Sequence, residues 1–294
     1  MLEISCSIVM YHNPVEELRV AIESFLNCSK NIRLYLVDNS SDDSLRYQFL
    51  SPQIEYIFTG KNLGYGAAHN IAIKKAQGNS RYHIILNPDI EFNPAVLNGL
   101  YDFMQQNNNI GLVMPKVLYK SGLTQYLCKR LPSPADLFLR RFFPGPLKKL
   151  FKKLLAEYEL RHKDYNSIME VPNLSGCFMF IRTSVFENVG LFDEQYFMYL
   201  EDTDLSRRIN KYYRTVYYPH ETITHGYSKA SYKSFKLMKH HLTSSVKYFN
   251  KWGWFTDQNR LSINQSINYS SFKPQLKAGE LKIQVPSQQH SSIA

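Results

Sequence analysis

The sequence has few cysteines, no long apolar run and fewer acidic than basic residues. Its 294 residues include four cysteines, and no two of them form a Cys-x-x-Cys pair. This spacing argues against a disulfide scaffold and a zinc knuckle, and it is typical of reduced thiols in a cytoplasmic protein. No apolar run approaches the roughly 18 residues that a transmembrane helix needs. Residues 1–14 lack the basic start of a signal peptide, so they predict a first β-strand instead.

The charge balance is basic, with 35 Lys and Arg residues against 25 Asp and Glu residues, a net charge of +10. Such a surface suits an acidic partner, and charge alone leaves open nucleic acid, an anionic membrane or a phosphorylated small molecule. Hydrophobic residues make up 44% of the chain. This fraction is ample for a core and excludes general disorder.

Strand and helix patterns alternate through the first third of the chain, which predicts βαβ crossovers and a mainly parallel sheet with helices on both faces. We expect strands at 4–11, 33–37, 54–58, 82–86, 110–114 and 215–218, and helices at 14–27, 45–50, 94–107 and 232–252, with another that ends at 76. In such sheets, ligands bind where the strands end. The predicted domain spans 1–230, followed by a basic helix at 231–255 and a loosely packed polar tail at 256–294.

Two motifs follow expected strands near the start of the chain. In "VDNSSDD", Asp38 stands at a strand end, where its carboxylate could accept hydrogen bonds from a base or ribose; a turn that caps the next helix explains the same letters. In "NLGYGAAHN", the glycines resemble a dinucleotide fingerprint, but His69 occupies the position that needs Gly or Ala. A helix N-terminus that faces an anion, or a turn with positive φ, remains open.

The triplet "NPD" interrupts the apolar strand "IIL". Asn87 and Asp89 flank Pro88, which ends the strand because it lacks a backbone donor. The two oxygen-bearing side chains could hold one divalent cation against a diphosphate. An ordinary β-turn with proline at its second position is the alternative.

The second half offers a cluster of carboxylates and one notable histidine. "YLEDTDLSRRI" contains Glu201, Asp202 and Asp204 after an aromatic stretch that could raise a carboxylate pKa toward that of a general base. Capping of a helix start is the alternative. His225 in "THGYSKAS" could bind a metal or phosphate, or be structural.

Residues 129–164 form a basic and leucine-rich insert. "PLKKLFKKLLAEYEL" places leucines on one helical face, flanked by Lys148, Lys149, Lys152 and Lys153. This pattern predicts an interfacial helix on an anionic membrane surface. A nucleic-acid site and a core helix with a basic edge are the alternatives; of the three, we favour the membrane and expect no nucleic-acid partner.

In this order, the motifs resemble the inverting family 2 glycosyltransferases, and within them the bacterial rhamnosyltransferase-like branch. The resemblance spans residues 3–230, and the block 175–209 is its most specific part. It implies a GT-A fold of the α/β class, in which a nucleotide-binding half (1–115) is fused to an acceptor-binding half (166–230).

The resemblance also implies residue roles. Asp202 would be the catalytic base, with Glu201 beside it. Asp89, with His225 near it, would hold Mg²⁺ or Mn²⁺ where the family has its Asp-x-Asp motif. The donor nucleotide would be bound by Asp38, Asn62, Gly64, Asn70 and Asn87, and the acceptor by Ser175 and Gly176.

The function expected from this resemblance is metal-assisted transfer of a sugar. The first candidate for that sugar is L-rhamnose, with dTDP-rhamnose as the donor. The acceptor would be a saccharide hydroxyl on a lipid-linked intermediate of a bacterial surface polysaccharide such as lipopolysaccharide O-antigen or capsule. The enzyme would lie in the cytoplasm, peripheral on the inner face of the plasma membrane. A nicotinamide-dependent oxidoreductase, which His69 opposes, and a non-enzymatic polysaccharide-binding or membrane-binding protein are the alternative functions.

Overall fold

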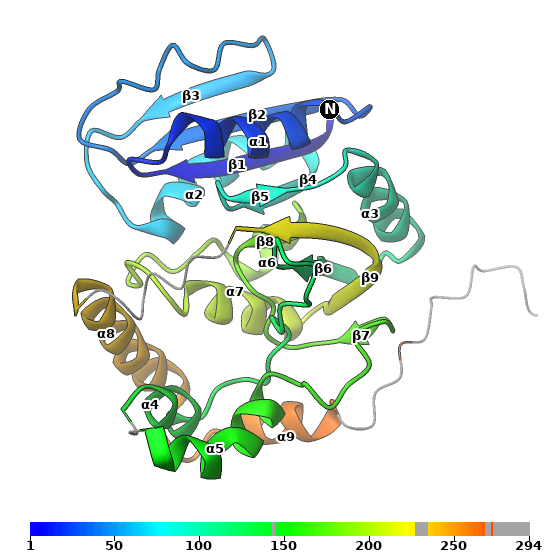
Figure 1. Cartoon of the computed structure of the whole chain (residues 1–294). Helices are drawn as coiled ribbons and strands as arrows, with labels where there is room; N and C mark the ends of the chain where they lie inside the picture. Colours follow the sequence, from blue (N-terminus) through cyan, green and yellow to red (C-terminus); the bar gives the residue numbers. More distant parts are fainter. Residues whose placement is uncertain (143–144, 227–234, 268–271, 273–294) are drawn as a thin grey trace, which may run out of the picture.

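One nine-stranded sheet organises the chain (Figure 1). The computed structural model describes residues 1–142, 145–226, 235–267 and 272, with backbone alone for 139–142 and 145–151. The strand order is β3-β2-β1-β4-β8-β6-β9-β5, and β7 pairs with β9. The strands are β1 (Leu2–Met10), β2 (Ile32–Asp38), β3 (Ile54–Phe58), β4 (Ser80–Leu86), β5 (Ile90–Glu91), β6 (Ile110–Leu118), β7 (Met169–Glu170), β8 (Phe178–Arg182) and β9 (Arg214–His225).

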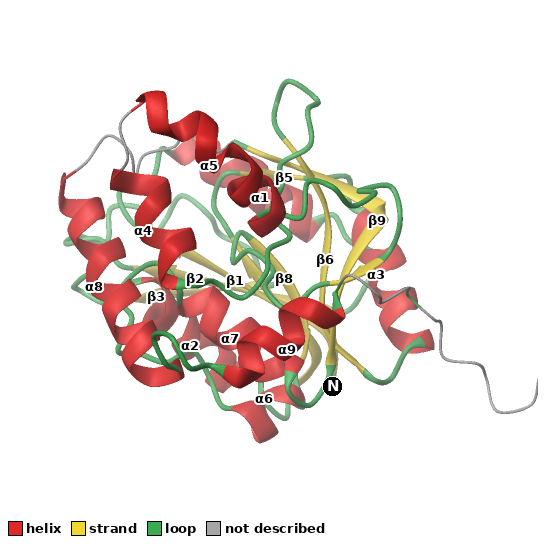
Figure 2. Ribbon diagram, turned by 90° about the horizontal axis from the view of Figure 1, so that it is seen from below, coloured by secondary structure: helices red, strands yellow, loops and turns green. Residues whose placement is uncertain are grey.

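Helices cover both faces of this sheet (Figures 1 and 2). They are α1 (Val15–Leu26), α2 (Tyr65–Ala76), α3 (Ala95–Gln106), α4 (Pro134–Phe142), α5 (Gly145–Tyr158), α6 (Val185–Val189), α7 (Glu201–Asn210), α8 (Phe235–Trp252) and α9 (Gln258–Ser266). Among the described residues, no helix combines the length and apolar character needed to cross a membrane.

Alternation along β1 explains how two helices pack on its opposite faces. Ile4, Cys6, Ile8 and Met10 are fully buried in the main core with α1, whereas Ser5 and Ser7 face the other side, where α2 packs. Successive side chains of a strand point to opposite faces, so one segment can serve both layers.

A chain of buried polar groups links β1, α2 and β4. Ser7 Oγ lies 2.7 Å from His69 Nδ1 and 2.9 Å from His83 Nε2, and Ser5 Oγ lies 2.8 Å from His83 Nδ1 and 2.7 Å from Ser80 Oγ. Burial lowers the pKa of His83 from 6.5 to about 3 and that of His69 well below its ordinary value. Both rings are therefore neutral at physiological pH, which agrees with their enclosure beside serine hydroxyls.

The sheet is mainly parallel, as expected, but it also contains antiparallel pairs. β3, β2, β1 and β4 are parallel, as expected for the nucleotide-binding half, and β6 is parallel to β9. β8 runs antiparallel between β4 and β6, with Phe178 opposite Leu86. The start of β8 therefore lies at the edge where β4 ends, so the segment before β8 reaches the "NPD" triplet.

The first helix of the insert packs internally. Leu137 of α4 forms a small buried cluster with Tyr196, Leu200, Tyr248 and Phe249, and Figure 2 shows α4 between α5 and α8. α4 therefore contributes to a core, whereas the interfacial helix expected from "PLKKLFKKLLAEYEL" falls on α5 and stays a prediction.

Two further expectations differ from the structure. Residues 45–50 form turns instead of a helix. The start of the expected loose tail is the helix α9, whose N-cap Asp257 accepts a hydrogen bond from Arg260 N and pairs with the buried Arg207 at 2.7 Å. Asn264 also bonds both backbone groups of Leu131, which fixes α9 on the insert. Residues 273–294 of that tail lie outside the described residues.

Candidate active site

Asp38 ends β2 at the carboxyl edge of the parallel strands, as expected. Its side chain is fully buried and accepts hydrogen bonds from Ser40 N at 2.9 Å and from the Tyr56 hydroxyl. Both oxygens therefore face protein groups. Direct contact with a nucleotide base requires that Tyr56 turn away, because the oxygen of the Tyr56 hydroxyl group occupies one side of the carboxylate.

The Gly-rich loop packs against the second half of the protein. Gly64 has a φ of +90°, and a Cβ there would lie 2.3 Å from the Phe197 carbonyl oxygen. Gly64 N donates to Asn62 Oδ1 at 2.9 Å, and Tyr65 N donates to Phe197 O at 2.9 Å. These two amides at the start of α2 are thus already used, and the positive φ of Gly64 fits the turn alternative. Donor binding by Asn62 and Gly64 stays a prediction.

Asn70 makes structural hydrogen bonds within the protein, and its expected contact with the donor stays a prediction. Its amide nitrogen donates to Phe192 O and Glu194 Oε1, each at 2.9 Å, and its oxygen accepts from Phe192 N at 2.9 Å. Both N–H groups are consumed, so Asn70 ties α2 to the segment that leads toward Glu201.

A continuous line of contacts connects the "NPD" triplet to the acidic pair. The Tyr65 hydroxyl lies 3.0 Å from Asn87 Oδ1 and 2.7 Å from Gly176 O. Gly176 N donates to Asp202 Oδ2 at 2.9 Å, and a Cβ at Gly176 would lie 3.0 Å from Asp202 Cβ. The expected acceptor residue Gly176 and the expected base therefore touch, and Ser175, which is partly exposed, precedes them.

Tyr65 also bears on the orientation of Asn87. A hydroxyl has one hydrogen, and the closer acceptor is the Gly176 carbonyl. Donation to Gly176 leaves the Tyr65 oxygen as an acceptor for the Asn87 amide in its flipped orientation. In that orientation the Asn87 oxygen is free to face a cation.

The two members of the acidic pair lie in different environments. Glu201 is 5% exposed, and burial together with neighbouring Asp202 raises its pKa well above the ordinary value. Its Oε2 is one of the buried side-chain atoms without a hydrogen-bond partner among the described residues. Asp202 is partly exposed, and its carboxylate accepts from Thr203 N at 2.7 Å and from Gly176 N. Burial therefore favours the protonated form of Glu201, whereas Asp202 presents a partly exposed carboxylate.

Asp89 and His225 meet, as the resemblance implies. His225 Nε2 lies 3.2 Å from Asp89 Oδ1, and the side chains are 7% and 24% exposed. Gln125 donates through Nε2 to the carbonyls of His225 and Leu118, so its oxygen faces His225 Nδ1 at 3.0 Å and accepts from it. The ring then presents Nε2 to the Asp89 carboxylate. A cation bound between Nε2 and the carboxylate would stabilise this arrangement.

This donor set fits a divalent cation whose shell is completed by substrate. In the part of the chain that the structure describes, no group of three or more His, Cys, Asp or Glu side chains is arranged to hold a metal. Mg²⁺ and related ions bind through one or two protein ligands, with phosphate oxygens and waters in the remaining positions. Asp89 and His225 match that pattern.

The structure describes the side chains of two of the four lysines that the membrane prediction named. Lys152 and Lys153 of α5 are exposed. The side chains of Lys148 and Lys149 lie outside the described residues, as do residues 227–234 after His225.

Two residues of the site were not expected from the sequence. Tyr65 lies one helical turn before His69, and its ring contacts that imidazole edge-on at 4.4 Å between centroids. Its place between two glycines at a helix start was the available signal. Gln125, which orients His225, carries no local signal because it lies 100 residues earlier.

The family assignment follows from comparison with known sequences. A family model described as "Glycosyl transferase family 2" matches residues 6–190, which is more than half of the chain. The chain belongs to glycosyl transferase family 2. This match includes the Gly-rich loop, the "NPD" triplet and the start of β8.

Curated relatives agree with this assignment. The family 2 chain is 27% identical over 262 residues to the N-acetylglucosaminyl-diphospho-decaprenol L-rhamnosyltransferase of Mycobacterium tuberculosis, covering 82% of this chain and 83% of that protein. It is 25% identical to the rhamnosyltransferase WbbL of Escherichia coli K12, covering 82% and 90%. It is 30% identical over 178 residues to the hexosyltransferase Agl10 of Haloferax volcanii, but this covers only 60% of this chain and 52% of that protein. The enzyme class of the family 2 chain is therefore glycosyltransferase.

Solved structures confirm the expected GT-A fold. GalNAc-T7, crystallised with UDP, GalNAc and Mn²⁺, aligns with a TM-score of 0.59 and 15% identity, over 91% of this chain and 54% of that one. TarS of S. aureus (residues 1–349) aligns with a TM-score of 0.53 and 13% identity, over 90% and 70%. At these identities the likeness supports the fold alone.

Proposed function

We propose that the protein transfers a sugar from a nucleoside diphosphate donor to a hydroxyl of a saccharide acceptor, with inversion at the anomeric carbon. The observation that supports this most is the line of contacts from Asn87 through Tyr65 and Gly176 to Asp202. It connects the predicted diphosphate end of the site to the predicted base. One sugar can therefore contact both ends.

The proposed chemistry is a single displacement. Asp202 accepts the proton of the acceptor hydroxyl, whose oxygen then attacks the anomeric carbon as the bond to the diphosphate breaks. Burial raises the pKa of Glu201 and so disfavours a second negative charge beside Asp202. No enzyme nucleophile is needed, and all four cysteines are buried and free.

Asp89 and His225 would hold Mg²⁺ or Mn²⁺. The ion, when bound, neutralises charge on the departing diphosphate. Gln125 fixes the histidine in the tautomer that offers Nε2. Asn87 supplies an uncharged oxygen where the family has an aspartate, so the charge of the site depends on Asp89.

The finer assignment is transfer of L-rhamnose from dTDP-rhamnose to a lipid-linked acceptor in surface polysaccharide synthesis, on the cytoplasmic face of the plasma membrane. Two relatives named as rhamnosyltransferases support the sugar, and the name of one includes a diphospho-decaprenol acceptor. The contacts of the Gly64 loop do not favour the oxidoreductase alternative, because this loop, which would have to face a nicotinamide cofactor, packs on Phe197.

A panel of nucleotide-sugars tests the donor. With Mn²⁺ present, dTDP-rhamnose is expected to raise the unfolding temperature more than UDP-sugars, GDP-sugars or NAD, since binding to the native state stabilises it. The same panel without Mn²⁺ is the control. Stabilisation by NAD alone would favour the oxidoreductase, and a preference for another nucleotide-sugar would replace the rhamnose assignment while keeping the reaction class.

A vesicle-flotation assay tests the membrane surface. The wild-type protein is expected to float with vesicles that contain anionic lipid and not with neutral ones, and Lys152→Glu with Lys153→Glu is expected to weaken flotation. Lys74→Glu with Lys120→Glu changes the charge of two exposed lysines elsewhere by the same amount and should have a smaller effect. Equal recovery with both lipid types would contradict an electrostatic surface.

A further inference from the structure

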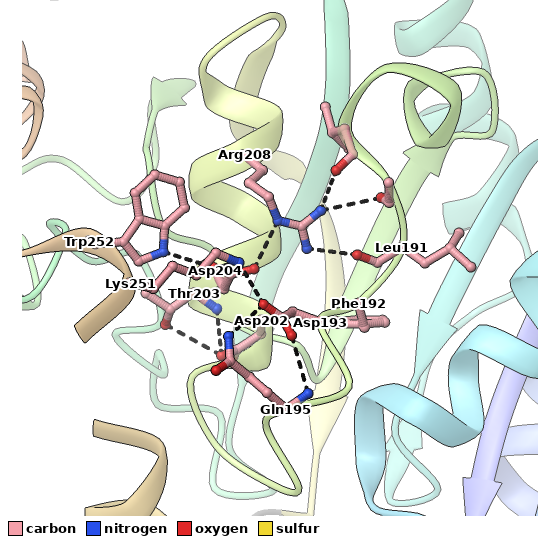
Figure 3. Close-up of polar contacts among 12 residues, drawn as sticks. Leu191, Phe192, Asp193, Gln195, Asp202, Thr203, Asp204, Arg208, Lys251 and Trp252 are labelled. Atoms are coloured by element: carbon pink, nitrogen blue, oxygen red, sulfur yellow. Dashed lines mark hydrogen bonds and ion pairs between the residues drawn. The ribbon is translucent and has the colours of Figure 1, made fainter. Parts of the chain in front are cut away.

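Asp204 lies two residues after the proposed base and is enclosed by donors from two helices. It is fully buried, and it accepts from Arg208 Nε, Lys251 Nζ and Trp252 Nε1, each at 2.8 Å (Figure 3). Arg208 belongs to α7, whereas Lys251 and Trp252 end α8. A buried carboxylate is stable when it is paired and hydrogen-bonded in this way, so Asp204 fixes the end of α8 against the start of α7.

The same cations bind the segment that leads to the acidic pair. Lys251 Nζ also lies 2.7 Å from Asp193 Oδ2. Arg208 donates to the carbonyls of Val189 and, at 2.7 Å, of Leu191, as Figure 3 shows. The segment before the acidic pair is therefore held at its beginning by the partners of Asp204.

Residues 196–200, here called the catalytic strap, connect that segment to Glu201. Tyr199 and Leu200 have φ values of +70° and +67°, which are unfavourable for residues with side chains. Such conformations persist only where the surroundings impose them. The strap therefore needs external contacts to keep its shape.

α8 supplies those contacts. Ser244 Oγ donates to Met198 O at 2.8 Å, and the His240 ring stacks on Phe197 at 4.6 Å. On its other side, Phe197 O accepts from Tyr65 N of the Gly-rich loop. The strap thus lies between the donor half of the protein and α8.

We propose that Asp204, Lys251 and Trp252 form a positioning clamp through which α8 sets the location of Asp202; this rests on the proposed function, in which Asp202 is the base. Asp202 and Asp204 share the first turn of α7, and Asp204 N donates to Leu200 O at 2.9 Å. A shift of α7 at Asp204 moves Asp202 with it. Misplacement of a catalytic group by about 1 Å can lower the rate by about 100-fold.

Trp252→Phe tests the clamp with little change in packing. It removes the indole N–H from Asp204 but keeps an aromatic ring where the Arg207 guanidinium lies 4.1 Å from the ring centroid. We expect kcat for transfer to fall about tenfold, with donor affinity unchanged, because the donor half is untouched. Trp254→Phe is the matched control, since that indole N–H bonds only the exposed Asn250 side chain. The control should retain wild-type kcat.

Hydrogen exchange gives a readout that does not depend on activity. The amides of Gly176 and Thr203 donate to Asp202 and should exchange faster in Trp252→Phe than in Trp254→Phe. This result would support the clamp even if no sugar were transferred, whereas absence of transfer by the wild type would count against the proposed function alone. Equal exchange of these amides and equal kcat in the two variants would overturn the clamp. A parallel loss of donor affinity and unfolding temperature in Trp252→Phe would also overturn it, in favour of general destabilisation.

Discussion

Asp202→Asn is expected to lower kcat for sugar transfer by about 10²- to 10⁴-fold, the range that general bases contribute. The amide has nearly the shape of the carboxylate but cannot accept the proton of the acceptor hydroxyl. Donor affinity should change little, because Asp202 contacts Gly176 and Thr203 on the acceptor side of the line of contacts. Transfer rates at saturating donor and acceptor, with donor binding measured separately, give the comparison.

Glu201→Gln is the matched control for this prediction. The raised pKa of Glu201 favours the uncharged side chain, whose size and hydrogen-bonding groups glutamine approximates. Transfer should therefore remain within a few-fold of wild type. If Glu201→Gln abolished transfer while Asp202→Asn preserved it, the two roles would be exchanged.

Asp89→Ala is expected to remove the Mn²⁺-dependent part of donor affinity, a loss of about 100-fold or more. The substitution leaves His225 as one ligand, and an imidazole alone binds a divalent cation more weakly than an imidazole and a carboxylate together. Gln125→Leu should have a smaller effect, about tenfold, because it alters only the orientation of His225. Titration of the donor with and without Mn²⁺ measures both.

Glu91→Ala is the control for the loss of a nearby negative charge. Glu91 is exposed and two residues from Asp89, on the strand β5. It should leave metal-dependent binding intact. Unchanged Mn²⁺-dependent affinity in Asp89→Ala would mean that other groups hold the ion, and the "NPD" triplet would then be a turn with no metal role.

The sequence predicts those parts of the fold that depend on local patterns. The strand at 54–58 has the expected limits, and the helix at 94–107 differs by one residue at each end, because apolar periodicity is a property of consecutive residues. The direction of β8 has no such signal, since it depends on pairing with β4 and β6. The cap of α9 did have a signal, Asp257, which the polar composition of the tail concealed.

The site residues likewise include some that a local sequence pattern predicts and others that depend on long-range pairing. Asp89 was expected at the end of a strand, and that position follows from the apolar run before Pro88. Its meeting with His225 depends on the pairing of Ile90 with His225, which lies 135 positions later in the sequence, and no local pattern contains this pairing. The case of Asn70 shows the converse: a motif position suggested ligand binding, but a distant loop uses its amide.

The reversed strand β8 has a consequence for how the enzyme can change. The chain leaves the sheet after β6, pairs with β9 through the short strand β7, and enters β8 at Phe178; both helices of the insert lie between β6 and β7. The return point of this excursion is fixed by the pairing of Phe178 with Leu86, next to the "NPD" triplet. We expect exposed positions of the excursion that lie outside the cluster around Leu137, such as Lys152 and Lys153, to tolerate exchange without a shift of either end. We therefore expect that exchanges in this excursion can change the acceptor preference while the residues of the proposed site stay the same.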